Sequence, residues 1–289
     1  MRTFAILCLV LLAASCDDPA GTQVTRRSPA SGSASDAAPK KPGSVTVDHS
    51  QTTAEAVENG APAATRPWLP TDYVKFDAYL AKMPRGSYPR FGSGKSGDLF
   101  KRVIESANQT ILTNRDIHVN SRMPMCLQMQ SAVSNALKRY ARAHVSGTDY
   151  STELVYLQGI SLAMSREMLK LVDEFLLTVD PNDGKHETRM AGHRQAKSGV
   201  AMQLDGCLQS LQETHTYSSE ERQVLCRYLL ENGPTILRYL EQIVQREFQI
   251  KVGKVAKAER DKAVRGLLEQ FLSAISGSGP AKTPTGGQE

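Results

Sequence analysis

The 289-residue sequence has no apolar segment long enough to cross a membrane as a permanent helix, which excludes a multi-span membrane protein. It also lacks a large excess of charge of one sign, because 35 lysines and arginines stand against 30 aspartates and glutamates, a net charge of +5. The densest basic clusters, at 138–142 and 251–262, are not interleaved with exposed aromatic residues on which nucleic-acid bases could stack. We therefore expect solvent-facing charged helices and no nucleic-acid partner.

Residues 16–67 contain no Phe, Tyr, Trp, Leu or Ile, although six of the 14 prolines of the chain fall there. A segment of this composition cannot form a hydrophobic core, so it is predicted to be a disordered tether. A second stretch rich in Gly, Pro and Thr, 277–289, is predicted to be a disordered tail. Residues 68–276 remain as one folded domain.

The first residues have the three parts of a secretory signal. Arg2 precedes the apolar run Phe4–Leu12, and the small residues Ala13–Ser15 stand before Cys16. The sequence Leu-Ala-Ala-Ser-Cys resembles the lipobox of bacterial lipoproteins. The resemblance implies removal of residues 1–15, attachment of acyl chains such as palmitate to Cys16, and a position in the cell envelope that faces the periplasm.

Acyl chains on Cys16 would hold the protein on the membrane, since each buried methylene group contributes about 0.8 kcal/mol. Asp17 follows directly, and in the lipoproteins that this chain resembles an aspartate there implies retention at the inner membrane. An ordinary signal peptide cleaved nearby, with Cys16 unmodified, is the alternative interpretation. The resemblance covers the first 18 residues and implies nothing about the folded domain.

From residue 68 onward, apolar residues recur at spacings of three and four, without sustained alternation of period two. This pattern predicts an all-α fold, a bundle-like array of about seven or eight antiparallel helices. The expected helices are 71–83, 97–111, 124–140, 152–179, 186–213, 219–232, 234–252 and 264–275.

Particular residues predict where these helices begin and end. Pro124 suits the first position of a helix, and Ser218 with Glu221 forms a capping box. Gly233 is predicted to end one helix and Pro234 to open the next. The longest helix carries a continuous apolar stripe and is expected to be the central spine of the domain.

Five cysteines allow at most one internal disulfide in the mature chain. Cys8 leaves with the signal and Cys16 takes lipid, so Cys126, Cys207 and Cys226 remain. If the two helices that carry the last two form a hairpin, these cysteines are almost equidistant from its turn. We therefore predict a Cys207–Cys226 disulfide, with three buried thiols or a pair that includes Cys126 as alternatives.

Three glycines, Gly192, Gly199 and Gly206, recur every seven residues in the expected helix 186–213. Because each glycine inside a helix costs about 1 kcal/mol relative to alanine, the pattern indicates that something requires the missing side chains. The first interpretation is a face where a neighbouring helix packs closely, a contact that would include Gly159. The second is a groove where a ligand or partner helix approaches the backbone.

No catalytic, cofactor or metal-binding motif is recognisable. The six histidines include no pair at a spacing of three or four, so a helical zinc motif is absent, as is a nucleophile elbow. Met123, Met125, Cys126 and Met129 form a soft-ligand cluster of the kind that holds Cu(I), but Met125 and Met129, one turn apart, also fit a core stripe. No catalytic residue, metal ligand or cofactor is therefore predicted.

These observations predict a membrane-anchored exported lipoprotein whose helical domain is a non-catalytic binding module for another envelope protein. The alternative is a small-ligand carrier or an enzyme with a groove along the helix 186–213. Copper handling is a third hypothesis. A binding module should present an accessible surface, whereas a carrier or enzyme should enclose a pocket with converging polar groups.

Overall fold

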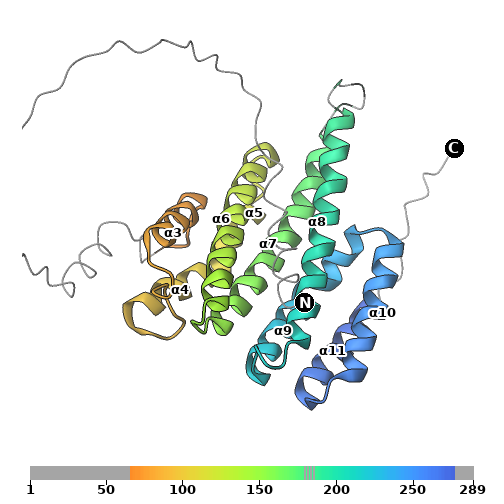
Figure 1. Cartoon of the computed structure of the whole chain (residues 1–289). Helices are drawn as coiled ribbons and strands as arrows, with labels where there is room; N and C mark the ends of the chain where they lie inside the picture. The colour runs from red at the N-terminus through yellow and green to blue at the C-terminus, as the bar shows by residue number, and fades with distance from the viewer. Residues whose placement is uncertain (1–65, 179, 181, 183, 185, 277–289) are drawn as a thin grey trace, which may run out of the picture. The chain divides into compact units, whose positions relative to one another are not determined.

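In the computed structural model, residues 66–276 are described apart from 179, 181, 183 and 185 (Figure 1). The described residues form nine α-helices and one short 3₁₀ helix, with no β-strand among them, which confirms the all-α prediction. The elements are α3 (Pro70–Lys82), α4 (Gly94–Ile104), η2 (Ser106–Gln109), α5 (Thr110–Thr113), α6 (Val119–Val145), α7 (Ser151–Leu177), α8 (His186–Gln212), α9 (Ser219–Tyr239), α10 (Gln242–Ala258) and α11 (Lys262–Ser276). The predicted signal peptide, tether and tail lie outside the described residues, except for Arg66 and Pro67.

Helix α7 is the central spine, as its apolar stripe predicts. Of its 27 residues, 17 are buried, on nearly all sides of the helix. It packs against α6, α8 and α9, while α11 packs against α9 and α10. Figure 1 shows α6, α7, α8 and α9 running up and down beside one another, so successive helices are antiparallel.

Helices α7 and α9 run parallel to each other, because α8 lies between them in the chain. Their N-termini are tied together by Glu221, whose Oε1 accepts hydrogen bonds from the hydroxyls of Ser151 (2.7 Å) and Thr152 (2.6 Å). Glu221 also completes the predicted capping box, which is confirmed: its carboxylate accepts from the backbone N–H of Ser218 at 2.7 Å. One carboxylate therefore caps α9 and fixes its register against α7.

The three-helix contact of α6, α7 and α8 includes a chain of three hydrogen bonds, two of them buried and one partly buried. Gln130 Nε2 donates to Ser165 Oγ at 3.0 Å, and Ser165 Oγ donates to Gln203 Oε1 at 2.7 Å. Gln203 Nε2 in turn donates to Ser161 Oγ at 2.7 Å. Because buried polar groups need partners, this chain specifies one register for the three helices.

A group of aromatic residues connects the loop before α4 to α6 and α7. The hydroxyl of Tyr140 donates to the carbonyl of Pro89 at 2.8 Å, and that of Tyr150 accepts from the N–H of Tyr88 at 2.9 Å. These bonds hold the loop so that the ring of Phe91 stacks on Tyr156, with centroids 4.6 Å apart.

The helix predicted over 97–111 is broken in the structure, and the break has a local cause. Asn108 donates from Nδ2 to the carbonyl of Arg102 at 2.6 Å and accepts at Oδ1 from the N–H of Trp68, also at 2.6 Å. A side chain that bonds to the backbone in this way competes with the helical hydrogen bonds. The helix therefore ends at Ile104, and η2 and α5 follow it.

Three further boundary predictions are wrong. Thr71 does not cap α3, because the flanking residue is Leu69, and Pro124 lies inside α6, which begins five residues earlier with His118 as its cap. Helix α9 continues through Gly233 and Pro234 to Tyr239.

Gly233 serves packing rather than helix termination. It is buried, and an added Cβ atom would lie 2.7 Å from Cε2 of Phe271 on α11. The ring of Phe271 therefore needs the space that glycine leaves, and the helix is free to continue.

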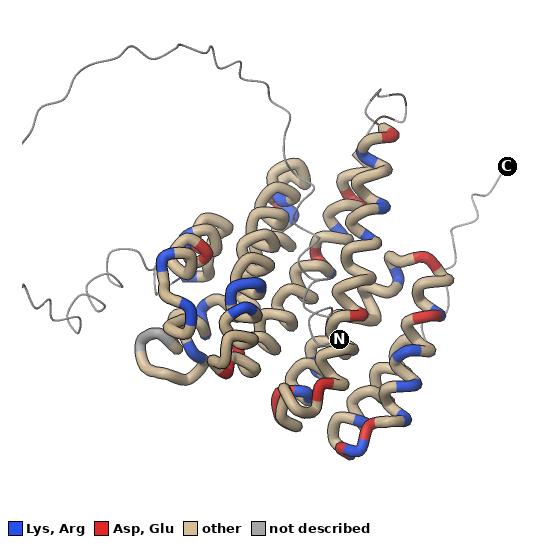
Figure 2. Tube along the Cα trace, viewed as in Figure 1, with Lys and Arg blue, Asp and Glu red and all other residues tan. Residues whose placement is uncertain are grey.

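Charged residues of both signs are distributed over the helices (Figure 2). Within the two basic clusters of the sequence, Arg139 pairs with Asp77 (Nε to Oδ1, 3.1 Å) and Lys251 with Asp205 (Nζ to Oδ2, 2.6 Å). Part of each cluster is thus engaged with carboxylates of neighbouring helices.

Candidate functional site

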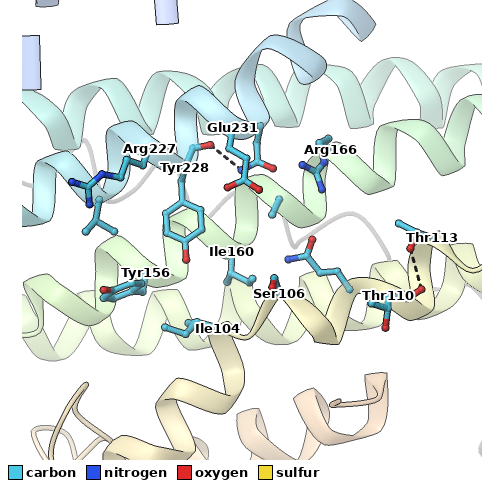
Figure 3. A pocket seen from close by; sticks show the side chains of 14 residues that line it. Ile104, Ser106, Thr110, Thr113, Tyr156, Ile160, Arg166, Arg227, Tyr228 and Glu231 are labelled. Carbon is cyan, nitrogen blue, oxygen red and sulfur yellow. Dashed lines mark hydrogen bonds between the residues drawn. The ribbon is translucent and has the colours of Figure 1, made fainter. Parts of the chain in front are cut away.

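An open cleft of about 620 Å³ lies between three parts of the domain (Figure 3). One wall comes from the end of α4, η2 and α5, the second from α7 and the third from α9. The break at Glu105 creates the first wall, because it turns the chain from α4 into the short segments that face α7 and α9.

The α9 wall consists of residues that recur at helical spacing. Val224, Arg227, Tyr228 and Glu231 are separated by three or four positions, so they share one face of the helix. Arg227 and Glu231 are exposed, whereas Val224 and Tyr228 are partly buried. This face therefore has two exposed charged groups, with an apolar and an aromatic side chain partly buried beneath them.

The ring of Tyr228 lies on the backbone of α7 at Gly159. A Cβ atom at this position would overlap the Tyr228 ring, so glycine is the residue that permits the contact. The ring also meets Tyr156 edge to face, with centroids 6.5 Å apart. Burial, with the nearby Tyr156 and Glu231, raises the pKa of Tyr228 to about 12, so its hydroxyl stays protonated at neutral pH.

Asn232 is a buried polar residue of the cleft with an unused acceptor. Its side chain is fully buried, and Nδ2 donates to the carbonyl of Tyr228 at 2.8 Å. Its Oδ1 atom has no hydrogen-bond partner among the described residues. An unpaired buried acceptor costs about 1–3 kcal/mol, so a donor from a bound molecule would be stabilising there.

The wall opposite α9 consists mainly of short polar side chains. Ser106, Gln109, Thr110 and Thr113 line it, and Figure 3 shows the Ser106, Thr110 and Thr113 side chains on the segment that faces Ile160 and Arg166. The hydroxyls of Thr110 and Thr113 bond to backbone carbonyls of their own turn, at 2.7 and 3.1 Å. They keep the ability to accept hydrogen bonds from a ligand.

Arg166 supplies the positive charge of the α7 wall. Its Nε donates to Glu167 Oε1 at 2.7 Å, and Glu167 also pairs with Lys170 at 3.0 Å. Neither Arg227 nor Glu231 is in an ion pair with another residue that the structure describes.

The chemistry of the cleft follows from the side chains that line it. Its lining residues include one carboxylate and no histidine or cysteine. Within the described ranges there is also no group of three or more His, Cys, Asp and Glu side chains that could hold a metal ion. Hydrogen bonding, ion pairing and aromatic contact are the interactions that it offers.

The three predicted glycines of α8 do not line the cleft. Gly192 is exposed, and nothing lies within 4 Å of a Cβ atom built there, so the close-packing prediction is wrong at this position. Gly199 is buried and Gly206 half-buried. Gly159 does make a close contact, but with α9 rather than α8, and the cleft has no lining residue from α8, where the alternative groove was expected.

The predicted Cys207–Cys226 disulfide is not formed, because both residues and Cys126 are free, buried thiols. The pair does lie close together: burial, with a contribution from Cys226, raises the pKa of Cys207 to about 12. Burial raises the pKa of the other two thiols to about 12 as well. Since disulfide exchange requires a thiolate, these surroundings oppose oxidation. Of the predicted core pair, Met129 is buried in the core and Met125 is partly buried against it.

Sequence reasoning misses every charged residue of the cleft. In the sequence, Arg227 and Glu231 have the spacing of two charged residues on a solvent-exposed helix face. Arg166 lies on a helix that is otherwise predicted to be buried. Asn232 is the residue whose presence could have indicated the site. An asparagine beside a glycine within a helix is unfavourable unless a contact or a function requires it.

No helix among the described residues is long and apolar enough to cross a membrane. No family model, curated protein or solved structure matches the chain.

Proposed function

We propose that the chain is an exported lipoprotein, anchored through Cys16, whose helical domain binds another envelope protein in the cleft between α7 and α9. The charged N-terminus, the short apolar run and the small residues before Cys16 support the anchor. A tether of about 50 residues has a root-mean-square span of about 40 Å, which would let the domain reach partners away from the membrane.

The cleft is the observation that carries the binding function. Polar side chains from three separate segments line it, together with the aromatic rings of Tyr156 and Tyr228. The unpaired acceptor of Asn232 lies in its lining. A concave surface with a few placed polar groups on an apolar floor is typical of a recognition site.

The openness of the cleft favours a segment of a larger partner over a small cargo molecule. A carrier surrounds most of the surface of its ligand, whereas this cleft has exposed residues such as Arg227, Glu231 and Thr110 along its rim. The carrier or enzyme alternative also expected its groove along α8, which contributes no lining residue.

Affinity capture from crosslinked envelopes tests this function. The tagged full chain is compared with Arg227→Glu, which reverses a charge in the cleft, and with Arg238→Glu, which reverses an exposed charge of the same helix outside the cleft. We expect the first substitution to abolish capture of a partner that the wild type and the second substitution retain. Equal capture by all three proteins would overturn the cleft as the binding site.

A further inference from the structure

Three charged residues lie in a row along the cleft. In Figure 3, Arg227, Glu231 and Arg166 follow one another from one end towards the other, so the charges alternate as positive, negative, positive. None of the three forms an ion pair with another: Arg166 pairs with Glu167 at 2.7 Å, and neither Arg227 nor Glu231 is in an ion pair with a residue that the structure describes.

The spacing of these charges follows from the register of α7 and α9. Arg227 and Glu231 are four residues apart on one helix, a rise of about 6 Å. Ser151 and Thr152 contact Glu221, and Gly159 contacts Tyr228. Residues that lie side by side on the two parallel helices therefore differ in number by 69 or 70.

This register places Arg166 beside Thr235, one further turn beyond Glu231. The rise from Glu231 to that level is again about 6 Å. The three charged side chains therefore start from backbone positions about 6 Å apart along the helix axis, over about 12 Å in all.

This interval matches the side-chain repeat of an extended peptide. In a β-strand, every second side chain points to the same face, and two residues span about 6.6 Å. An extended segment with an acidic, a basic and an acidic side chain at alternate positions would thus face Arg227, Glu231 and Arg166 in order.

The unpaired acceptor of Asn232 distinguishes an extended ligand from a helical one. A helix repeats its face every four residues, about 6 Å, and would match the charges equally well. Its backbone N–H groups are already bonded within the helix, however, while an extended chain has free N–H donors. The buried Oδ1 of Asn232 therefore favours the extended ligand.

We propose that the cleft between α7 and α9 binds an extended peptide segment of a partner protein with acidic, basic and acidic side chains at positions i, i+2 and i+4. This inference rests on the proposed function and names the chemistry of the partner. Arg227, Glu231 and Arg166 pair in this order with the acidic, basic and acidic side chains of the peptide. Asn232 Oδ1 accepts a hydrogen bond from a backbone N–H of the peptide. The hydroxyls of Ser106 and Thr110 are available to the peptide backbone from the opposite wall.

Fluorescence anisotropy with two labelled peptides tests the charge order. The chain from residue 17 to 289 is titrated, at low ionic strength, against Ala-Glu-Ala-Lys-Ala-Glu-Ala and against the reversed peptide Ala-Lys-Ala-Glu-Ala-Lys-Ala. We expect the first peptide to bind about tenfold more tightly, because every contact of the second joins like charges. Equal affinities would overturn the proposal, as would tighter binding of a helical peptide with the same charges four residues apart.

A charge substitution makes the test specific to the cleft. In Glu231→Lys all three charges are positive, so the preferred peptide should change to Ala-Glu-Ala-Glu-Ala-Glu-Ala. The matched control Glu247→Lys changes an exposed residue of α10 and should leave the wild-type preference intact. An unchanged preference in Glu231→Lys would also overturn the proposal.

The two proposals fail in different ways. If Arg227→Glu loses its envelope partner but the peptides bind equally, binding in the cleft stands and the charge order is wrong. If Arg227→Glu retains its partner, the cleft is not the site where that partner binds.

Discussion

The position of the Tyr228 ring, and with it one wall of the cleft, depends on the absence of a side chain at Gly159. Because a Cβ atom there would overlap the ring, Gly159→Ala must displace either Tyr228 or α9. We expect a loss of about 2 kcal/mol in the free energy of unfolding, typical of an overpacked core. Chemical denaturation followed by circular dichroism measures this change.

Gly192→Ala is the matched control, because this helical glycine has open space where the side chain would go. It should increase the free energy of unfolding by about 0.5–1 kcal/mol, through helix propensity and reduced freedom of the unfolded chain. If both substitutions destabilise the protein equally, α8 has the close contact that the heptad of glycines first indicated.

The thiols of Cys126, Cys207 and Cys226 should be nearly unreactive in the folded protein. With a pKa of about 12, each has a thiolate fraction at pH 8 that is on the order of a thousandfold below that of an ordinary cysteine. A colorimetric thiol assay on residues 17–289 should therefore detect three thiols in guanidinium chloride and almost none without it. Detection of a single thiol in the unfolded, unreduced chain would show that a disulfide had formed.

Single residues also show where sequence reasoning stops. The regular spacing of Gly192, Gly199 and Gly206 predicts close packing, which is wrong at Gly192, whereas aromatic rings lie against Gly159 and Gly233, which are outside this pattern. Each is explained by an aromatic residue far away in the sequence. Helix periodicity identifies a face but not the side chain that a distant helix places against it.

At the scale of helices, Glu221 joins the start of α9 to the start of α7. Burial favours its protonated form, but hydrogen bonds from Thr152, Ser151 and Ser218 outweigh this effect and lower its pKa. A carboxyl whose pKa is lowered in the folded state stabilises the protein above its unfolded pKa, near 4.5, and this contribution is lost as the pH falls towards the folded value.

Glu221→Gln should therefore destabilise the protein most near neutral pH. We expect a difference from the wild type of about 1.5 kcal/mol at pH 7, which shrinks as the pH falls below about 4.5. Glu220→Gln, an exposed neighbour in the same turn, should show little effect. A destabilisation by Glu221→Gln that is constant between pH 7 and pH 3 would contradict the role of its charge.

The sequence predicts the helices better than their ends. Apolar periodicity indicated α7, α8 and α11 to within a few residues, because each buries a continuous stripe. It failed where a tertiary contact decides the boundary: Asn108 interrupts a helix by bonding to Arg102 and Trp68, and Phe271 occupies the space above Gly233. The first wall of the cleft depends on the Asn108 break, so the site could not be predicted from helix periodicity.

At the scale of the whole molecule, the lipid proposed on Cys16 should decide where the protein is found. Cys16→Ala removes the acceptor thiol, so the chain should no longer incorporate labelled palmitate. Cell fractionation should find the wild type with membranes. A variant that lacks this cysteine and carries an ordinary cleavable signal peptide should be found in the periplasmic extract. Palmitate labelling of Cys16→Ala equal to that of the wild type would contradict the anchor.

Photo-crosslinking in intact cells tests the central claim, that the cleft is the surface which binds a partner. Benzoylphenylalanine replaces Thr110, an exposed residue of the cleft, or Gln209, an exposed residue of α8 outside it. We predict a light-dependent adduct from position 110 that disappears when Arg227→Glu is added, and no such adduct from position 209. The same adduct from both positions, or an adduct at 110 that Arg227→Glu leaves unchanged, would contradict the account.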